Sequence, residues 1–144
     1  NRELSSLSVQ AMNKNELLHS LSEKLSTLKR SSTEELEQSI FELERQIKSS
    51  FNLDKDWDTF QKHFTNVHPE FFTGLKAQFP KLSPNDLRIC AYIKMNLSTK
   101  EISTLMNIAP KSTRMNKYRL KKKMHLLDGE DLQEFISGDK FYAS

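Results

Sequence analysis

Apolar residues recur three and four positions apart from residue 4 to residue 28, and no Gly or Pro interrupts them. The repeat covers four heptads, and Lys14 is the polar position that breaks it. A repeat of about 3.5 residues over this length is typical of a helix paired in a coiled coil. The narrow seam and its Ser, Asn, Gln and Lys flanks favour pairing between chains, although one amphipathic helix packed on its own domain would show the same stripe. The predicted dimer interface comprises Leu4, Leu7, Leu18, Leu21, Leu25 and Leu28.

A second helical stripe follows after a short loop near residues 29–32. Ser32 and Glu35 have the spacing of a capping box, in which each side chain accepts a hydrogen bond from the other residue's backbone. A helical hairpin and a continued, offset coil both fit this arrangement. The apolar positions of this stripe are Leu36, Ile40, Leu43, Ile47 and Phe51.

The segment 51–80 holds the single Trp and most of the Phe residues. Its aromatic positions have helical spacing and predict two helices that face a core. Asp54 or Asp56 is expected to cap the first helix, and Pro69 to lie in the first turn of the second. The apolar sets are Trp57, Phe60, Phe64 and Val67, and then Phe71, Phe72, Leu75 and Phe79. His63 and His68 have no carboxylate or Cys at ligand spacing, so no metal site is predicted.

Three further helices are indicated after Pro80. Ser83 with Asp86, and Ser98 with Glu101, have capping-box spacing, and Asn96 can adopt the left-handed conformation that ends a helix. Residues 107–109 make a tight connection to a third helix, which runs from Pro110 to about Met124. A short helix, a turn of a few residues and a longer helix make a helix-turn-helix.

Composition agrees with an all-α protein, because three Gly and four Pro among 144 residues leave little turn chemistry. No apolar run approaches the roughly 20 residues of a membrane span. The single cysteine, Cys90, excludes an internal disulfide and lies in an apolar run, which predicts an inert core thiol. The chain begins at Asn1, already within the first stripe, and is therefore expected to be a piece of a longer protein.

Positive charge is concentrated in the last of these regions. The chain carries a formal charge of +3, but the segment from Lys81 to Leu126 has eleven basic and two acidic residues. The rest of the chain is consequently net acidic. Such an asymmetry indicates one region that binds a polyanion and another with a different role.

The helix expected over 110–124 separates its apolar and basic residues on opposite sides. At 100° per residue, Thr113, Leu120 and Met124 form one narrow stripe that should be buried. The opposite side carries Lys111, Arg114, Met115, Tyr118, Lys121 and Lys122. A solvated basic surface would look similar, but the preceding capped helix and turn favour entry into the major groove. There, lysines would neutralise phosphates and Arg, Tyr and Met would contact base edges.

The stretch from Leu82 to Leu126 resembles the LuxR-type, or GerE-type, helix-turn-helix of bacterial transcription regulators. Leu97-Ser98 and Lys100-Glu101-Ile102 match the middle element of that family's pattern, and Lys123-Met124 matches its closing pair. The sequence departs from the pattern at several positions. Asn96 replaces Gly, Ser103 replaces Ala, Ser112-Thr113 replaces Thr-Val, Asn116 replaces His, and Ala109 replaces the usual Ser cap.

A wider resemblance covers nearly the whole chain and is to the output segment of sensor-linked bacterial regulators, whose N-terminal parts carry tetratricopeptide repeats or propellers. It implies a cytoplasmic output segment in two-component-like signalling, a homodimer held by the coiled coil, an upstream sensor and, in many such proteins, a membrane span. The family's base-reading positions fall on Arg114, Met115 and Tyr118. Its phosphate-anchoring positions fall on Thr99, Lys100, Lys111, Ser112, Lys117 and Lys121, to which the basic face adds Lys122. A final pairing helix is expected over 128–137, with Leu132, Phe135 and Ile136 as its apolar contacts.

We therefore expect an N-terminal helical dimerisation region over 1–50 and a DNA-binding domain over 51–144, together a transcription regulator that binds duplex DNA. The alternative is a coiled-coil adaptor whose helix-turn-helix binds protein. An enzyme is not expected, because the sequence lacks a nucleophile–base–acid set, a phosphate-binding Gly loop and metal-ligand spacing. No cofactor or small-molecule substrate is expected either. The operator, the sign of regulation and the upstream signal are not encoded in these patterns.

Overall fold

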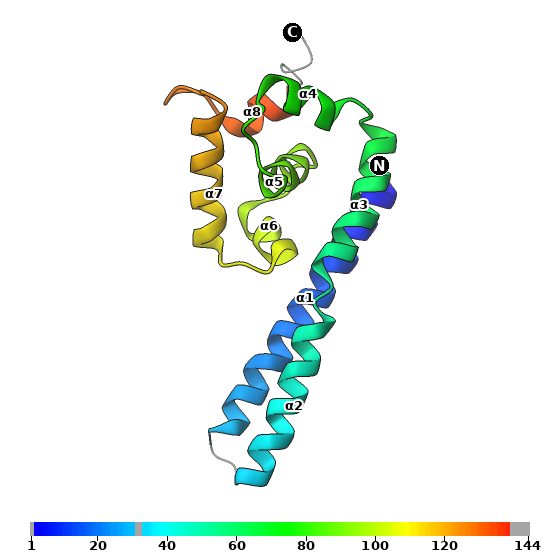
Figure 1. Ribbon diagram of the computed structural model, residues 1–144, viewed down its shortest axis with the longest axis vertical. Helices are drawn as coiled ribbons and strands as arrows, with labels where there is room; N and C mark the ends of the chain where they lie inside the picture. The colour runs from blue at the N-terminus through cyan, green and yellow to red at the C-terminus, as the bar shows by residue number, and fades with distance from the viewer. Residues whose placement is uncertain (1, 31–32, 139–144) are drawn as a thin grey trace.

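The computed structural model describes residues 2–30 and 33–138, and this part of the chain contains helices and no strand (Figure 1). The expected all-α class is confirmed. The helices are α1 (Arg2–Lys29), α2 (Glu34–Ser50), α3 (Leu53–Val67), α4 (Phe71–Gln78), α5 (Pro84–Lys94), α6 (Thr99–Met106), α7 (Pro110–Lys123) and α8 (Leu132–Ser137). No described helix combines the length and apolar character that crossing a membrane requires.

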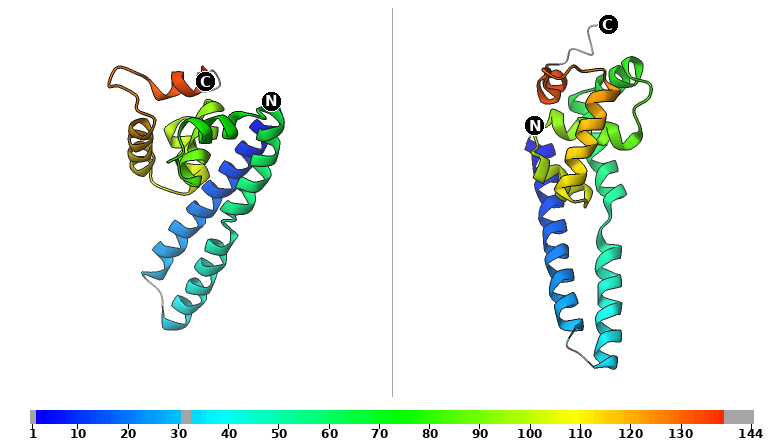
Figure 2. Two further views of the ribbon diagram at one scale, coloured as in Figure 1. Left: turned by 45° about the horizontal axis from the view of Figure 1, so that its top comes forward. Right: turned by 90° about the vertical axis from the view of Figure 1, so that its left-hand side faces the viewer.

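Helices α1 and α2 form an antiparallel hairpin, whose far end projects beyond the other helices (Figures 1 and 2). Ser26 donates a hydrogen bond to Glu44 at 3.3 Å, and Lys29 lies 3.5 Å from the same carboxylate. Nearer to the N-terminus of α1, Lys14 pairs with Asp56 of α3 at 2.8 Å. Of the two arrangements that the sequence left open, the structure therefore has the hairpin.

The side of α1 that packs within the chain differs from the predicted leucine seam. Ser8 and Asn15 are buried, whereas Leu21 and Leu28 are 40% and 56% exposed. Leu4 lies both on the predicted leucine seam and on the buried side of α1, and it is completely buried. The reason is that α1 packs against α2, α3 and α6 together, so three neighbouring helices rather than one partner helix determine which side of α1 is buried.

Two local predictions about helix starts were wrong. Asn52, not Asp54 or Asp56, occupies the N-cap of α3, and it makes no side-chain cap bond. Helix α4 begins at Phe71, so Pro69 precedes it by two residues. The predicted capping box of α2 involves Ser32, which lies outside the described residues; the N-cap there is Thr33, without a side-chain cap bond.

An aromatic core holds α3, α4 and α5 together. Trp57 lies 5.7 Å from the rings of both Phe60 and Tyr92, and Phe64 contacts Phe71 edge-on at 5.1 Å. Leu4 joins the same cluster, so the first turns of α1 belong to the core of the C-terminal helices even though the predicted domain boundary falls at residue 50. Val67, expected in the stripe, is instead 40% exposed. Cys90 is completely buried, and its burial raises the pKa of the thiol, as expected for an inert core cysteine.

Candidate nucleic-acid interface

Two capping boxes position the helices that precede α7. The Ser83 hydroxyl accepts from the Asp86 amide at 3.1 Å, and the Asp86 carboxylate accepts from the Ser83 amide at 2.9 Å. Ser98 and Glu101 repeat the same two bonds at 3.1 and 2.9 Å. Both boxes were predicted from the sequence and are confirmed. They fix the residues at which α5 and α6 start.

The turns between these helices use left-handed asparagines. Asn96 has φ 62° after α5, and Asn107 has φ 54° as the C-cap of α6. Asn is one of the few residues besides Gly that tolerates this conformation, since its short side chain can hydrogen-bond locally. Asn96 therefore ends α5 in the left-handed conformation that was predicted for it. Ala109, in extended conformation, leads into Pro110, and α7 ends at Lys123, close to the predicted Met124.

The apolar side of α7 is held against α5 and α6. Thr113 and Leu120 are completely buried and Met124 is 3% exposed, which confirms the predicted stripe. The hydroxyls of Ser103 and Thr113 lie 2.7 Å apart in the interior between α6 and α7. At the far end, Lys123 donates to the buried Asp86 carboxylate at 2.6 Å. These contacts fix both ends of α7 on the scaffold.

The other side of α7 is open to solvent. Met115 and Tyr118 are 47% and 62% exposed, and Arg114 is exposed beside them. The Lys122 ammonium lies 4.5 Å from the centre of the Tyr118 ring, in cation–π contact. We call this surface the basic face; its members are Lys111, Arg114, Met115, Tyr118, Lys121 and Lys122. The structure places all three predicted base-reading residues on it.

Two predicted phosphate ligands from different helices meet at the N-terminus of α6. The half-buried Lys117 of α7 donates to the Thr99 hydroxyl at 2.9 Å. Burial lowers the pKa of Lys117, and the nearby Asp131 carboxylate partly opposes that effect. Lys100, which follows Thr99 in α6, is exposed. The first backbone amides of a helix also attract anions, so this cluster is suited to a phosphate.

An acidic segment beside the basic face was not anticipated. Arg114, Lys117, Tyr118 and Lys121 line a groove whose other wall is formed by Asp131, Leu132 and Gln133. Lys121 also donates to the main-chain carbonyl of Asp128 at 3.5 Å. The sequence signal was the acidic run at 128–131, which was interpreted only as part of a helix. It is instead a turn, and Asp131 caps α8 by accepting from the Glu134 amide at 3.2 Å.

Helix α8 uses its apolar residues within the chain. Leu132 is 8% exposed and Ile136 is completely buried, and Phe135 contacts the Phe79 ring at 6.0 Å. Gln133 donates to the Ile93 carbonyl at 2.9 Å and ties α8 to the end of α5. The residues expected to pair two final helices therefore pack within the chain, against the end of α5 and Phe79.

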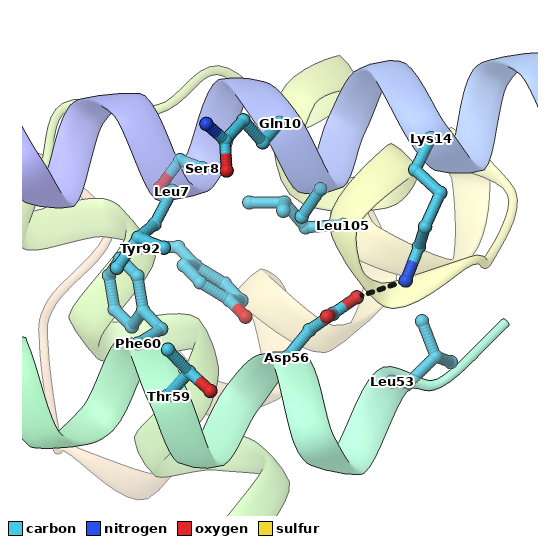
Figure 3. A pocket seen from close by; sticks show the side chains of 11 residues that line it. Leu7, Ser8, Gln10, Lys14, Leu53, Asp56, Thr59, Phe60, Tyr92 and Leu105 are labelled. Carbon is cyan, nitrogen blue, oxygen red and sulfur yellow. Dashed lines mark hydrogen bonds and ion pairs between the residues drawn. The ribbon is translucent and has the colours of Figure 1, made fainter.

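A separate pocket opens between α1 and α3, with α5 and α6 behind it (Figure 3). Leu7, Phe60 and Leu105 supply much of its wall, and the Lys14–Asp56 ion pair crosses one end. Neither a His nor a Cys lines it. Within residues 2–30 and 33–138, no group of three or more His, Cys, Asp or Glu side chains is placed to hold a metal ion.

Comparison of the chain with models of protein families, with curated proteins and with solved structures found no match.

Proposed function

We propose that this chain binds duplex DNA sequence-specifically as a LuxR-like helix-turn-helix, with α7 as the recognition helix in the major groove. The observation that carries the proposal is the solvent-open basic face of α7 beside the capped N-terminus of α6. A helix entering the major groove needs cations on both sides for phosphates and longer polar or apolar side chains between them for bases. The basic face has this composition.

The residues divide by chemistry. The Arg114 guanidinium has the fork of donors that pairs with guanine acceptors, and Met115 and Tyr118 offer apolar contact to thymine methyls. Lys111, Lys121 and Lys122 supply phosphate contacts along the helix. Lys117, Thr99 and Lys100 form a second anchoring group at α6, so the duplex backbone would be held at two places.

Regulation of transcription, an upstream sensor and a cytoplasmic location rest on the resemblance described above. If the chain is such an output segment, the hairpin is the part that connects the helix-turn-helix to the sensor. The contact between α1 and α6, where Asn15 donates to the Thr104 carbonyl at 3.0 Å, would then join the two.

The proposal is tested by fluorescence anisotropy of a labelled random-sequence duplex over a range of salt concentrations. We expect wild-type binding to weaken steeply with salt, because bound phosphates release counterions. The variant Arg114→Glu, Lys122→Glu should lose binding. The control Lys55→Glu, Lys62→Glu makes the same charge change on exposed positions of α3 and should bind nearly as wild type.

Equal losses in both variants would mean that net charge, not the basic face, controls binding. No binding by folded wild-type protein at low salt would contradict the proposal. The second candidate function, a protein-interaction module, would then gain support, and the observation favouring it is the row of exposed leucines on the hairpin.

A further inference from the structure

The pocket between α1 and α3 lies where the hairpin meets the helix-turn-helix. Four helices form its walls, with Leu7 and Lys14 from α1, Asp56 from α3, Tyr92 from α5 and Leu105 from α6. Its volume is about 220 Å³. Sites for drug-sized ligands are larger, at roughly 300–1,000 Å³. The space therefore suits a small molecule rather than a large cofactor.

Tyr92 presents its hydroxyl to this pocket. The residue is 5% exposed, and its ring packs against Trp57 at 5.7 Å and Phe60 at 5.2 Å. The hydroxyl points out of the aromatic core into the pocket, toward the Asp56 carboxylate (Figure 3). Among residues 2–30 and 33–138 it has no hydrogen-bond partner. Buried tyrosine hydroxyls usually have one, so this hydroxyl is available to a molecule in the pocket.

The space between Tyr92 and Asp56 favours a cationic donor. Burial raises the pKa of the Tyr92 hydroxyl, and the Asp56 charge adds to this effect whereas the Arg88 charge opposes it. The hydroxyl therefore stays neutral, with lone pairs that can accept a hydrogen bond. The Asp56 carboxylate is an acceptor as well. An ammonium group between these two oxygens would donate to both.

Lys14 supplies the opposite charge at the same end of the pocket. Its ammonium donates to Oδ2 of Asp56 at 2.8 Å, and the two side chains are 38% and 34% exposed. Both groups are thus accessible from solvent. The bond leaves further donors on Lys14 and the Oδ1 oxygen of Asp56 for another molecule. This end of the pocket therefore presents a positive and a negative group side by side.

A pair of opposite charges selects the class of ligand. A ligand with a single charge would be attracted by one member of the pair and repelled by the other, whereas a zwitterion is attracted by both. In an α-amino acid the ammonium and the carboxylate are attached to one carbon. The ammonium can then lie between Asp56 and Tyr92 while the carboxylate meets Lys14. The side chain would lie against the apolar walls, which include Leu7 and Leu105.

We propose that this pocket binds a free α-amino acid with an apolar side chain. The sequence patterns did not indicate a ligand here, because the polar groups come from three separate helices. The bound amino acid would contact α1, α3, α5 and α6 together, and so would stabilise the packing of the hairpin on the helix-turn-helix. This inference does not depend on DNA binding.

Titration of the whole chain with leucine, methionine and phenylalanine, followed in two-dimensional amide NMR spectra, tests the proposal. We expect saturable shifts that are largest around Lys14, Asp56 and Tyr92. Two analogues of leucine separate the charges, because isocaproate lacks the ammonium group and isopentylamine lacks the carboxylate. Each should bind at least about tenfold more weakly than leucine, since each loses a charge-assisted hydrogen bond.

Two variants locate the site. Tyr92→Phe keeps the ring in the aromatic core and removes only the hydroxyl. It should bind leucine about tenfold more weakly, while its unfolding midpoint without ligand stays at the wild-type value. Lys14→Met should also weaken binding. The control Lys62→Met removes the same charge from an exposed position of α3 and should bind as wild type.

Three results would overturn the proposal. The first is the absence of saturable shifts with any of the three amino acids up to their solubility limits, which would mean that the pocket holds only solvent. The second is equal affinity for leucine and isocaproate, since the ammonium group would then have no role. The third is wild-type affinity in Tyr92→Phe. None of these measurements involves DNA, so failure here and failure of DNA binding are distinguishable.

Discussion

The hydroxyls of Ser103 and Thr113 share a hydrogen bond of 2.7 Å between α6 and α7, and the two residues are 3% and 0% exposed. These are two of the positions at which the sequence departs from the LuxR-type pattern, where Ala and Val are usual. In the structure, the two departures form one contact: an apolar pair is replaced by a hydrogen-bonded pair. Ser103 also donates to the Thr99 carbonyl at 2.7 Å, so Thr113 can act as the donor in the shared bond.

Removing the Ser103 hydroxyl alone should lower the free energy of unfolding more than removing the hydroxyls of both Ser103 and Thr113. Ser103→Ala leaves the buried Thr113 hydroxyl without its partner, and we expect a loss of about 1–3 kcal/mol in the free energy of unfolding. Thr113→Val should lower the free energy of unfolding less, because the Ser103 hydroxyl still donates its hydrogen bond to the Thr99 carbonyl. The double variant restores the usual apolar pair and should be close to wild type. Urea denaturation of all four proteins gives the coupling energy, and additive losses would contradict this account.

Asp86 should make stability depend on pH in the acid range. Burial alone would raise its pKa, but hydrogen bonds from Lys123 and from the Ser83 amide and hydroxyl outweigh it, and the pKa lies below its ordinary value. A lowered carboxyl pKa contributes stability that is complete above the unfolded value, about 3.9, and is lost as the pH falls through the folded value.

The variant Asp86→Asn removes the charge that Lys123 meets and should be less stable than wild type by about 1 kcal/mol at neutral pH. The difference should shrink below about pH 4, where wild type also loses the charge. Thermal unfolding of both proteins between acid and neutral pH measures this difference in stability. Asp128→Asn, at an exposed position, is the control. A difference that stays constant down to the lowest pH would rule out the ion pair as its source.

Lys117 and Lys122 of α7 should both contribute to DNA affinity, but only Lys117 should also contribute to stability. Lys122→Met removes an exposed phosphate contact and should reduce the slope of log affinity against log salt by about 1, with little effect on stability. Lys117→Met should lower affinity as well, but it also breaks the bond to Thr99 that links α6 and α7. We expect it alone to lower the unfolding midpoint. Equal midpoints for the two variants would mean that the Lys117–Thr99 bond does not hold the helices together.

Local signals explain which parts of the fold the sequence predicted well. The boxes at Ser83 and Ser98, the Asn96 stop and the buried stripe of α7 each depend on residues within a few positions of one another. These features could therefore be predicted without knowledge of the tertiary fold. The basic face could be predicted from the same angular spacing, because its residues lie on the side of α7 opposite Thr113 and Leu120.

Features that depend on distant contacts were predicted less well. A heptad pattern fixes Leu4 and Leu18 on a seam but does not say whether the intervening positions are Leu7 and Leu21 or Ser8 and Ser22, because both choices have the same period. Only the contacts with α2, α3 and α6 decide. The same holds for α8, whose Ile136 is buried against its own chain, and for Asp131, which folding brings beside Lys117.

Arg114 should determine specificity rather than affinity for DNA in general. Arg114→Lys keeps the positive charge but loses the forked donor geometry that distinguishes guanine from other bases. After a preferred site has been selected from random sequences with wild type, we expect the variant to bind that site more weakly by about 1–3 kcal/mol, while its affinity for random duplex changes little. A second selection with the variant should show relaxed preference at one base pair per half-site. Arg30→Lys, at an exposed position of the hairpin, should alter neither quantity. If Arg114→Lys weakens random and selected duplexes equally, Arg114 contacts phosphate, and base reading by α7 would have to come from Met115, Tyr118 or residues nearer to Pro110.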